Sequence, residues 1–584
     1  MKKRFSFYVV LISFLAFNCQ KYGVLGPGGS GPNSFTGSLQ GKVVDEGGHP
    51  VAGVTVKLGI KTATTDPNGF FKFEDAKLDK AETVVSAERS GYYKAFRVFS
   101  ATSGVNNIVI GLVYKQLTGT IESNSGGSVS LSNGSKVELP ANGVVKQSGG
   151  GLYNGTINVF VSYIDPTFQS RYQTTPGSFL GYDKGGNKVL LATHGMLIVE
   201  LESPTGEKLQ IAKNKAATLT TAISSALRAN APATISMWYL DDVTGLWKEE
   251  GAASKIGDNY VGEVSHFSYW TCGQYSQIIN FIATFVDNFG FPLAERYIVI
   301  RQLNGITAAW GTTDSLGQIN NPIPANMSLI LEVENFCHAV EHTISLSPSS
   351  TNISLGTVSV TPVQTKTVTG RLLNCTGGPV TSGYAIVWYG NKGVSTPLMP
   401  DGGFVVQLSP CDGIYPNCKI VGVDNLTNQQ NATQTFNLTG SLTNVGNITT
   451  CGVSAEQFIS ERPNASVSYS VVYSSSFPDP LFWGYSNYAN STNEAYLTGG
   501  NGIMGTFFWF THTLSTGVFP MTRLSINETF SAITLIPPFN VSLTNYPNQV
   551  GEFFEGSFYG NYFLNNFPND IRYMDCLFRI RRTN

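Results

Sequence analysis

The feature that most constrains the fold of this chain is that its apolar residues alternate with polar ones along short stretches, which turn-forming residues interrupt. Val54, Val56 and Leu58 alternate in this way, and so do Phe71 and Phe73. Side chains that repeat with a period of two lie on one face of a β-strand, so both stretches are predicted to be half-buried strands. Gly, which accounts for 62 of 584 residues, and Asn, Asp and Pro separate such stretches along nearly the whole chain. We therefore expect an all-β fold.

Length and charge narrow the class of protein further. At roughly 150 residues per domain, a chain of 584 residues predicts several domains rather than one. Charged residues make up 13% of the chain, against about 25% in an ordinary soluble domain, and hydrophobic residues make up 42%. The formal net charge of −2 argues against nucleic acid as a partner, because nucleic-acid binding relies on an excess of Lys and Arg.

The first 18 residues are typical of a secretory signal peptide. Lys2, Lys3 and Arg4 precede an apolar stretch over residues 5–17, which is shorter than the roughly 20 residues that span a bilayer. The next residue but one is Cys19, and a cysteine directly after such a stretch resembles the lipidated first residue of a mature bacterial lipoprotein. The resemblance implies a membrane anchor at Cys19, with ordinary signal cleavage nearby as the alternative. Residues 19–37 are rich in Gly and Pro and are predicted to be a flexible tether.

Residues 38–115 contain the turn Asp66-Pro67-Asn68-Gly69 followed by Phe70-Phe71, and later Ser90-Gly91-Tyr92. This unit resembles the carboxypeptidase regulatory-like domain, which implies a small, non-catalytic, transthyretin-like β-sandwich. The same landmarks recur in residues 276–364, at Thr313-Asp314-Ser315-Leu316-Gly317, and in residues 365–450, at Pro400-Asp401-Gly402-Gly403-Phe404. We therefore expect three related sandwiches.

Two other units complete the predicted organisation of about five tandem β-sandwich domains. Residues 116–275 contain Met237-Trp238-Tyr239-Leu240 and Gly245-Leu246-Trp247. This region resembles the extracellular β-region of cartilage intermediate layer protein, a resemblance that implies no catalytic role. Residues 451–584 are rich in aromatic residues and are similar to terminal β-domains of bacterial surface lipoproteins.

Two sets of residues are candidates for binding or bridging. The flat rings of Trp238 and Trp247 are candidates for glycan contact, although alternation sends Trp238 and Tyr239 to opposite faces, so that at least one of them is expected in the core. Cys411 and Cys418 flank a short loop and are predicted to form a disulfide, which export favours. Seven cysteines remain besides Cys19, so one thiol stays unpaired or bonds another molecule, and the connectivity cannot be deduced.

No residue set predicts a catalytic centre, a metal site or a cofactor. His338 and His342 on one strand would stand about 13 Å apart, too far for a single metal ion. A rival hypothesis places a hydrolase site in the C-terminal unit, with His512 beside Glu552 or Glu555.

The sequence thus predicts a non-catalytic, lipid-anchored protein of the cell envelope that binds, adheres or scaffolds through tandem β-sandwiches. Its predicted location is the outer membrane, at the cell surface or alternatively facing the periplasm. The predicted partner is an unknown protein or glycan. Besides the hydrolase, the alternative is a glycan-binding accessory lipoprotein of a nutrient-uptake system. The triplet Asp314-Ser315-Leu316 also resembles an O-glycosylation site used in some bacteria.

Overall fold

The structure is a computed structural model in which the described part of the chain is almost entirely β-strand, with two short 3₁₀ helices, η1 (Arg171–Thr174) and η2 (Ser225–Asn230). It describes residues 33–581 except 47, 49, 66–68, 168–170, 289, 336–337, 362–365, 390–391, 409–416, 428, 432–433, 452, 455–456, 462–469, 475–482, 488–492, 501–504, 513–515, 527–532, 547–552 and 565–566. Within these residues, no helix has the length and apolar character needed to cross a membrane. The prediction of an all-β fold is confirmed.

The first small sandwich packs a three-stranded sheet, ordered β4-β1-β7, against a four-stranded sheet, ordered β3-β2-β5-β6. Its strands are β1 (Ser34–Val44), β2 (Thr55–Leu58), β3 (Lys61–Thr64), β4 (Phe70–Asp79), β5 (Thr83–Glu88), β6 (Ala95–Phe99) and β7 (Asn106–Gly111). The alternating residues Val54, Val56 and Phe71 all lie in its core, at 0 to 2% exposure. Because β1 begins at Ser34, the last four residues of the predicted tether are strand, and Gly37 pairs with Ala76 of β4.

The second and third sandwiches repeat this arrangement of sheets. The second has sheets β24-β21-β27 and β23-β22-β25-β26, and the third has β31-β28-β35 and β30-β29-β32-β33-β36, with β34 also paired to β32. The strands of the second are β21 (Ile278–Val286), β22 (Tyr297–Gln302), β23 (Thr307–Thr312), β24 (Gln318–Pro324), β25 (Leu329–Glu334), β26 (Val340–Leu346) and β27 (Ile353–Ser359). Those of the third are β28 (Lys366–Leu373), β29 (Gly383–Tyr389), β30 (Lys392–Pro397), β31 (Gly403–Leu408), β32 (Asn417–Asp424), β33 (Gln429–Gln430), β34 (Gln434–Asn437), β35 (Leu442–Thr449) and β36 (Val453–Ser454).

The three sandwiches share one glycine position that the sequence landmarks contain. Gly69, Gly317 and Gly402 have φ values of +69°, +73° and +82°. A Cβ at these positions would lie 2.2 to 2.5 Å from the carbonyl oxygens of Val43, Phe285 and Leu372, so each position accepts only glycine. In each copy the glycine carbonyl accepts a hydrogen bond from the backbone N–H of that same residue of the first strand. The repeated motif therefore performs one structural task three times.

The large unit between the first and second sandwiches is built on a single 13-stranded sheet. Its strands are β8 (Leu117–Glu122), β9 (Gly127–Ser130), β10 (Lys136–Leu139), β11 (Val144–Lys146), β12 (Thr156–Ile164), β13 (Leu180–Tyr182), β14 (Lys188–Glu202), β15 (Lys208–Ile211), β16 (Ala217–Ala222), β17 (Thr234–Leu240), β18 (Trp247–Ile256), β19 (Asn259–Val264) and β20 (Tyr269–Ser276). Strand β14 is buried along most of its length and pairs with β12, β13, β15 and β20. This sheet buries residues in two separate cores; one is shared extensively with the first and second sandwiches, and the other includes Ile306 of the second sandwich.

The C-terminal unit is one nine-stranded antiparallel sheet, ordered β38-β37-β45-β44-β43-β42-β41-β40-β39. Its strands are β37 (Gln457–Glu461), β38 (Ser470–Ser474), β39 (Trp483–Asn487), β40 (Asn493–Gly500), β41 (Gly505–His512), β42 (Gly517–Ile526), β43 (Ile533–Asn545), β44 (Phe553–Leu564) and β45 (Phe567–Arg581). The described strands of this β-rich unit therefore all belong to one continuous sheet.

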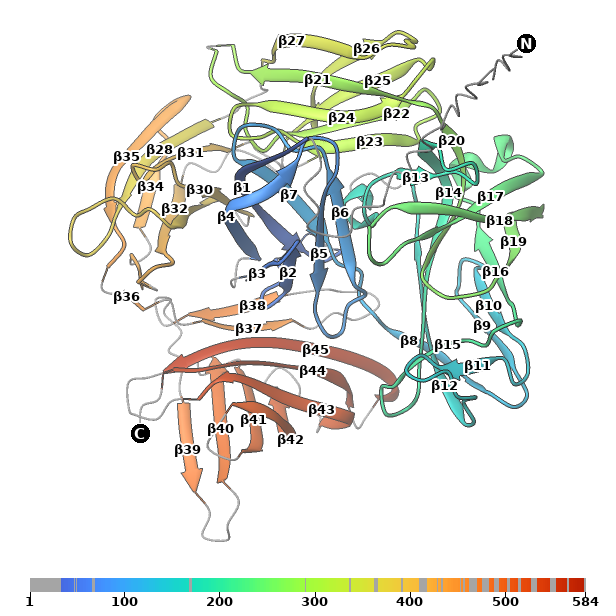
Figure 1. The fold of residues 1–584 in the computed structure, drawn as a ribbon. Helices are drawn as coiled ribbons and strands as arrows, with labels where there is room; N and C mark the ends of the chain where they lie inside the picture. The colour runs from blue at the N-terminus through green and yellow to red at the C-terminus, as the bar shows by residue number, and fades with distance from the viewer. Residues whose placement is uncertain are drawn as a thin grey trace, which may run out of the picture.

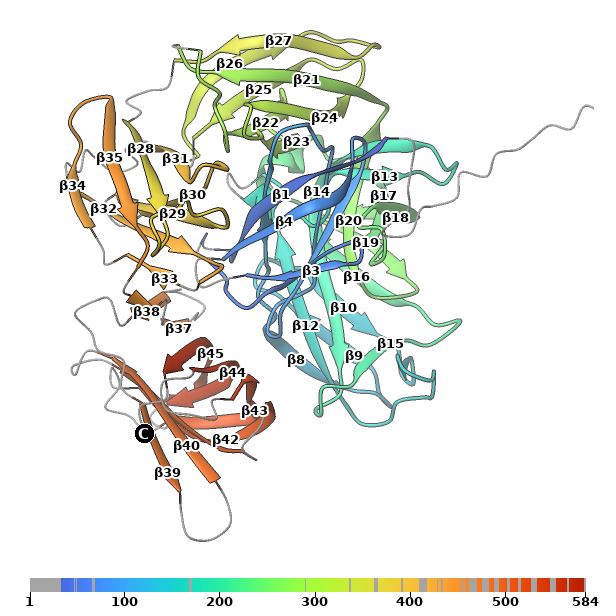
Figure 2. The same ribbon diagram turned by 60° about the vertical axis from the view of Figure 1, so that its left-hand side comes forward.

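Figures 1 and 2 show how these units are arranged in space. The first sandwich, in blue, lies beside both the large unit and the second sandwich, and in Figure 1 the third sandwich lies to its left and the C-terminal sheet below it. Phe70 of the first sandwich also packs against Tyr384 of the third. The first sandwich is therefore central, although it comes first in the chain.

Candidate functional site

Three units meet around one buried arginine of the first sandwich, at a place that we call the Arg97 joint. Arg97 lies on β6 and is 4% exposed. Its Nη1 donates a hydrogen bond to the carbonyl of Gly177 in the large unit, at 3.3 Å, and its Nη2 donates to the carbonyl of Trp310 in the second sandwich, at 3.1 Å. The guanidinium carbon also lies 3.6 Å from the centre of the Trp310 ring. One side chain therefore contacts all three units.

The backbone of β6 forms part of the same joint. The amide of Val98 donates to the carbonyl of Gly177 at 3.0 Å, and the amide of Gly177 donates to the carbonyl of Phe96 at 2.6 Å. These two bonds add a short parallel bridge from the large unit to the edge of the first sandwich. A buried guanidinium is tolerated where carbonyl oxygens and an aromatic face replace its water, which is the environment that the joint gives Arg97.

An apolar core continuous across the three units surrounds these polar contacts. The Tyr269 hydroxyl, from the large unit, donates to the carbonyl of Lys94 in the first sandwich at 3.0 Å. The shared core includes Tyr93, Phe96 and Val98 from the first sandwich, Phe179, Leu246, Trp247 and Tyr269 from the large unit, and Ile300 and Trp310 from the second sandwich. Because the core is continuous, the three units form one body rather than independent domains, since separating them would expose this core to water.

A polar seam joins the first and second sandwiches beside the joint. Asp314 is 2% exposed, and its Oδ2 accepts hydrogen bonds from the Thr102 hydroxyl at 2.8 Å and from the Gly104 amide at 3.0 Å. The next residue, Ser315, accepts from the Val105 amide at 3.0 Å through its hydroxyl oxygen. The triplet that resembles an O-glycosylation site therefore contributes two side chains to an interface between units, and its modification stays a prediction.

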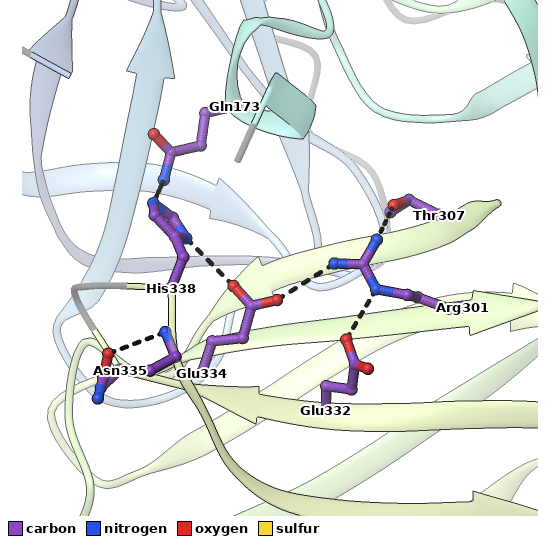
Figure 3. Close-up of polar contacts among 8 residues, drawn as sticks. Gln173, Arg301, Thr307, Glu332, Glu334, Asn335 and His338 are labelled. Atoms are coloured by element: carbon purple, nitrogen blue, oxygen red, sulfur yellow. Dashed lines mark hydrogen bonds and ion pairs between the residues drawn. The ribbon is translucent and has the colours of Figure 1, made fainter. Parts of the chain in front are cut away.

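A second polar cluster, shown in Figure 3, links the large unit to the far end of the second sandwich. His338 has a φ of +60° in the turn before β26, and its Nδ1 lies 3.1 Å from Oε2 of the buried Glu334. Its Nε2 lies 3.4 Å from Nε2 of Gln173, which comes from η1 of the large unit. Arg301 donates to Oε1 of Glu334 at 3.2 Å and to Glu332 at 2.7 Å. Burial of Glu334 is thus compensated by the Arg301 cation and by the polar contact with His338.

The same end of the second sandwich also reaches the third sandwich. Arg296 donates from Nη2 to the Gln407 side chain at 2.9 Å, and its Nε lies 3.5 Å from a carboxylate oxygen of Glu341. Burial lowers the pKa of Arg296, and burial also raises the pKa of its neighbour Glu295. Both shifts come from loss of water, which is the behaviour of an interior packing contact.

The space that the joint leaves is too small for an organic ligand. Two cavities border Arg97 and Asn321, and each measures about 20 Å³. A cavity of that volume holds about one water molecule, whereas ligand pockets usually measure roughly 300 Å³ or more. Among the described residues, no group of three or more His, Cys, Asp or Glu side chains is placed to hold a metal ion. The geometry of the joint therefore suits fixing the units relative to one another.

The prediction that Trp238 and Trp247 contact a glycan is wrong, because both side chains are buried. Trp238 and Trp247 are both 0% exposed, and their ring N–H groups donate to the backbone carbonyls of Gly273 and Ser178. Trp238 lies on β17 and Trp247 on the neighbouring strand β18. Strand β17 has neighbours on both sides, and its successive residues Met237 and Trp238 pack into the two different cores, so alternation does not bring Trp238 to solvent. These indoles belong to the core and cannot stack on a sugar in this fold.

The predicted bridge between Cys411 and Cys418 is contradicted at Cys418, which is a free thiol with 0% exposure. Alternation along β32 turns Cys418 into the core of the third sandwich, and burial raises the pKa of its thiol to about 11. Cys411 lies outside the described residues. Among the described cysteines, Cys375 and Cys451 form a disulfide.

The remaining candidates are placed as follows. His338 lies in the turn before β26 and His342 on that strand, so the two do not share a strand as expected. The side chains of His512 and Glu555 are not described, and Glu552 and Cys19 lie outside the described residues. Strands β42 and β43 separate β41, which carries His512, from β44, which carries Glu555. The hydrolase hypothesis therefore stays a prediction.

Arg97 and Asp314 were not identified as candidates for the joint from sequence. Their partners lie 80 to 213 residues away along the chain, and a lone arginine within an apolar strand was the only local signal.

The sequence of this chain is similar to known proteins over only part of its length. No family model matches the chain. Mouse cartilage intermediate layer protein 2 is 27% identical over 235 residues, covering 38% of this chain and 20% of that protein, and the human protein is 27% identical over 122 residues, covering 21% and 10%. The chain thus spans a fifth or less of the length of these relatives. The likeness to cartilage intermediate layer protein agrees with the expected resemblance at this coarse level.

Solved structures that resemble the chain include the Bacillus anthracis TIE protein, with a TM-score of 0.15, 10% identity and coverage of 71% of this chain and 49% of that one. The shaft pilin SpaA of Lactobacillus rhamnosus GG has a TM-score of 0.17 and 11% identity, covering 30% of this chain and 99% of the pilin. BcpA, the major pilin subunit of Bacillus cereus, has a TM-score of 0.13 and 11% identity, covering 56% and 100%. With TM-scores this far below 0.5, the likeness carries no conclusion about function.

Proposed function

We propose that this chain is an exported, non-catalytic protein of the cell envelope, which binds or scaffolds other molecules and is anchored by a lipid on Cys19. The observation that carries the proposal is the Arg97 joint. Three β-units share one buried core there, and the cavities beside it admit water only. A body of this kind holds surface loops in fixed relative positions, which suits the recognition of a large partner.

The anchor and the location rest on the sequence pattern before Cys19. A lipidated cysteine usually carries two or three acyl chains, and two chains give stable membrane attachment. Of the tether predicted over residues 19–37, the part before β1, residues 19–33, would reach roughly 20 Å, enough to hold the first sandwich clear of lipid headgroups.

Protease treatment of intact cells tests this proposal, with a Cys19→Ala strain beside the wild type. We expect the wild-type protein to be cut on intact cells and to stay with the membrane fraction, and the variant to be released. Protection of the wild type until the outer membrane is opened would move the protein to the periplasmic face. Retention of the Cys19→Ala protein in the membrane fraction would contradict the anchor.

A binding measurement tests the role itself. Purified protein lacking the first 19 residues is passed over immobilised glycans and envelope proteins, and the Arg97→Ala variant is compared with it. Retention that falls in the variant supports recognition by the assembled body. Turnover of a chromogenic glycoside or ester by the same protein would favour the hydrolase alternative.

A further inference from the structure

In each of the three small sandwiches, the first and the last strand of the three-stranded sheet are hydrogen-bonded neighbours that run parallel. Strand β1 pairs with β7, β21 pairs with β27, and β28 pairs with β35. Each ladder contains six residue pairs, such as Thr367 with Leu442 at one end of the third and Leu373 with Thr449 at the other. Neighbouring strands elsewhere in these sandwiches run antiparallel.

Parallel pairing of the first and last strands decides how tension acts on the unit. The chain enters at the start of the first strand and leaves at the end of the last, which lie at opposite ends of the ladder. A force that pulls the two ends apart therefore runs along the strands and loads all the ladder hydrogen bonds together. If the strands were antiparallel, the same force would open the bonds one after another, which requires much less force.

Where the chain leaves the last strand of this sheet, one more hydrogen bond to the first strand extends each ladder. The residue after the last strand donates its amide to the final carbonyl of the first strand, from Leu112 to Val44 and from Val360 to Val286. In the third sandwich Thr450 donates to Leu373 at 2.7 Å through its amide, and at 3.0 Å through its hydroxyl.

The third sandwich adds a covalent link at this exit. Cys375 follows β28 and Cys451 follows β35, so the disulfide joins the ends of the two parallel strands across a Cα–Cα distance of 5.1 Å. Tension entering at Lys366 runs along β28 to Cys375, crosses the disulfide and leaves at Cys451. Residues 376–450 lie outside this path and carry no tension while the bridge is intact.

Neither of the other small sandwiches can carry an internal bridge of this kind. The sequence has no cysteine between Cys19 and Cys272, so the first sandwich contains none, and residues 276–364 contain Cys337 alone. The third sandwich is thus the one small sandwich in which a covalent bond spans the first and last strands. It also lies between the fused body and the C-terminal sheet along the chain.

We propose that the third sandwich is a tension-carrying link, in which the Cys375–Cys451 disulfide takes force around residues 376–450 and keeps the unit from lengthening. This property goes beyond binding or scaffolding, and it depends on the proposed function only through export, which favours the bridge. A surface protein pulled by its partner would keep its C-terminal sheet at a fixed distance from the body.

Single-molecule pulling on the purified mature chain, with handles at its two ends, tests the proposal. The two cysteines are 76 residues apart, so at roughly 3.5 Å per residue the bridge hides about 26 nm of chain. We expect the fully extended oxidised protein to be about 26 nm shorter than the same protein pulled in dithiothreitol, because both cysteines are exposed to reductant. Equal extended lengths under the two conditions would overturn the proposal.

Two variants separate the bridge from other effects of reductant. Cys375→Ser with Cys451→Ser should show the long form without dithiothreitol, and Cys272→Ala, which removes a buried free thiol of the large unit, should keep the 26 nm difference. Should the double variant not fold, the wild type reduced after folding gives the same comparison. Since purified protein is used, failure of the surface-display experiment leaves this result unaffected, and equal lengths here leave display unaffected.

Discussion

Replacing Arg97 by alanine tests whether one side chain holds the three units together. The variant loses two hydrogen bonds from a charged donor, which contribute roughly 1.5 kcal/mol or more each, and a desolvated cation–π contact worth about 2 kcal/mol. Removing a buried charge offsets part of this loss, and the contributions are not additive. The Gly177 carbonyl keeps the Val98 amide as a donor, so it is not left without a partner. We therefore expect the joint to be destabilised by about 3 kcal/mol, in the range of a severe point mutation.

Amide hydrogen exchange measures this loss where it arises. The amides of Val98 and Gly177 bridge the first sandwich and the large unit, so they exchange when the joint opens. A loss of about 3 kcal/mol corresponds to roughly 100-fold faster exchange at both, since 1.4 kcal/mol is a factor of ten. Arg97→Lys, which keeps the charge but not the flat stacking group, should lie between the wild type and the alanine variant.

A matched control is Arg228→Ala, in the large unit. Arg228 pairs with Asp258 at 2.8 Å, but their side chains are 41% and 62% exposed, so loss of this pair should cost less than about 1 kcal/mol. We expect exchange at Val98 and Gly177 to stay unchanged in this control. A folded Arg97→Ala protein whose two amides exchange less than threefold faster than the wild type would refute the role assigned to Arg97.

Three further predictions concern the large unit. Trp238→Ala should lower stability by about 3 to 5 kcal/mol, seen as a large fall in melting temperature, because the indole is fully buried; an unchanged melting temperature would contradict its place in the core. Burial acts to raise the pKa of Glu200, but Lys115 and Lys208 outweigh it and hold the pKa below its ordinary value of 4.5. The stability that the lowered pKa of Glu200 contributes is fully present above pH 4.5 and is lost as the pH falls through that lowered pKa. The melting temperature should therefore fall more steeply in acid for the wild type than for Lys115→Met. Equal slopes for the two proteins would contradict the ion pairs. Burial raises the pKa of the Cys272 thiol to about 12, so iodoacetamide at pH 8 should label it only after unfolding, as mass spectrometry would show; rapid labelling of the folded protein would be inconsistent with this burial.

Local sequence patterns predicted the strands and the repeated turn well. Gly69, Gly317 and Gly402 occupy equivalent tight turns because each accepts a positive φ close to a carbonyl oxygen, a requirement that acts within one short segment. The alternating residues Val54 and Val56 face the first core for the same local reason.

Residues whose environment is set by distant segments were not predictable in this way. Trp238 is a candidate for the surface if a strand has one covered face, as alternation describes, whereas β17 contributes residues to a core on each of its faces. The role of Arg97 depends on Gly177 and Trp310, and no short pattern records contacts over such separations. Cys418 likewise pairs with nothing because its strand turns it inward, while Cys375 and Cys451 meet only once the sheet has formed.

The shared core has a consequence for the order in which this protein acquires its structure. Synthesis delivers the N-terminal segment first, so β6 emerges 213 residues before Trp310, which covers Arg97. Before the large unit has folded against β6, Phe96 and Val98, which belong to the shared core and lie beside Gly245, face solvent on an otherwise complete first sandwich. A nascent or translocating chain would therefore expose an apolar strand edge until the residues that cover it have been synthesised. A holding chaperone would bind at that edge.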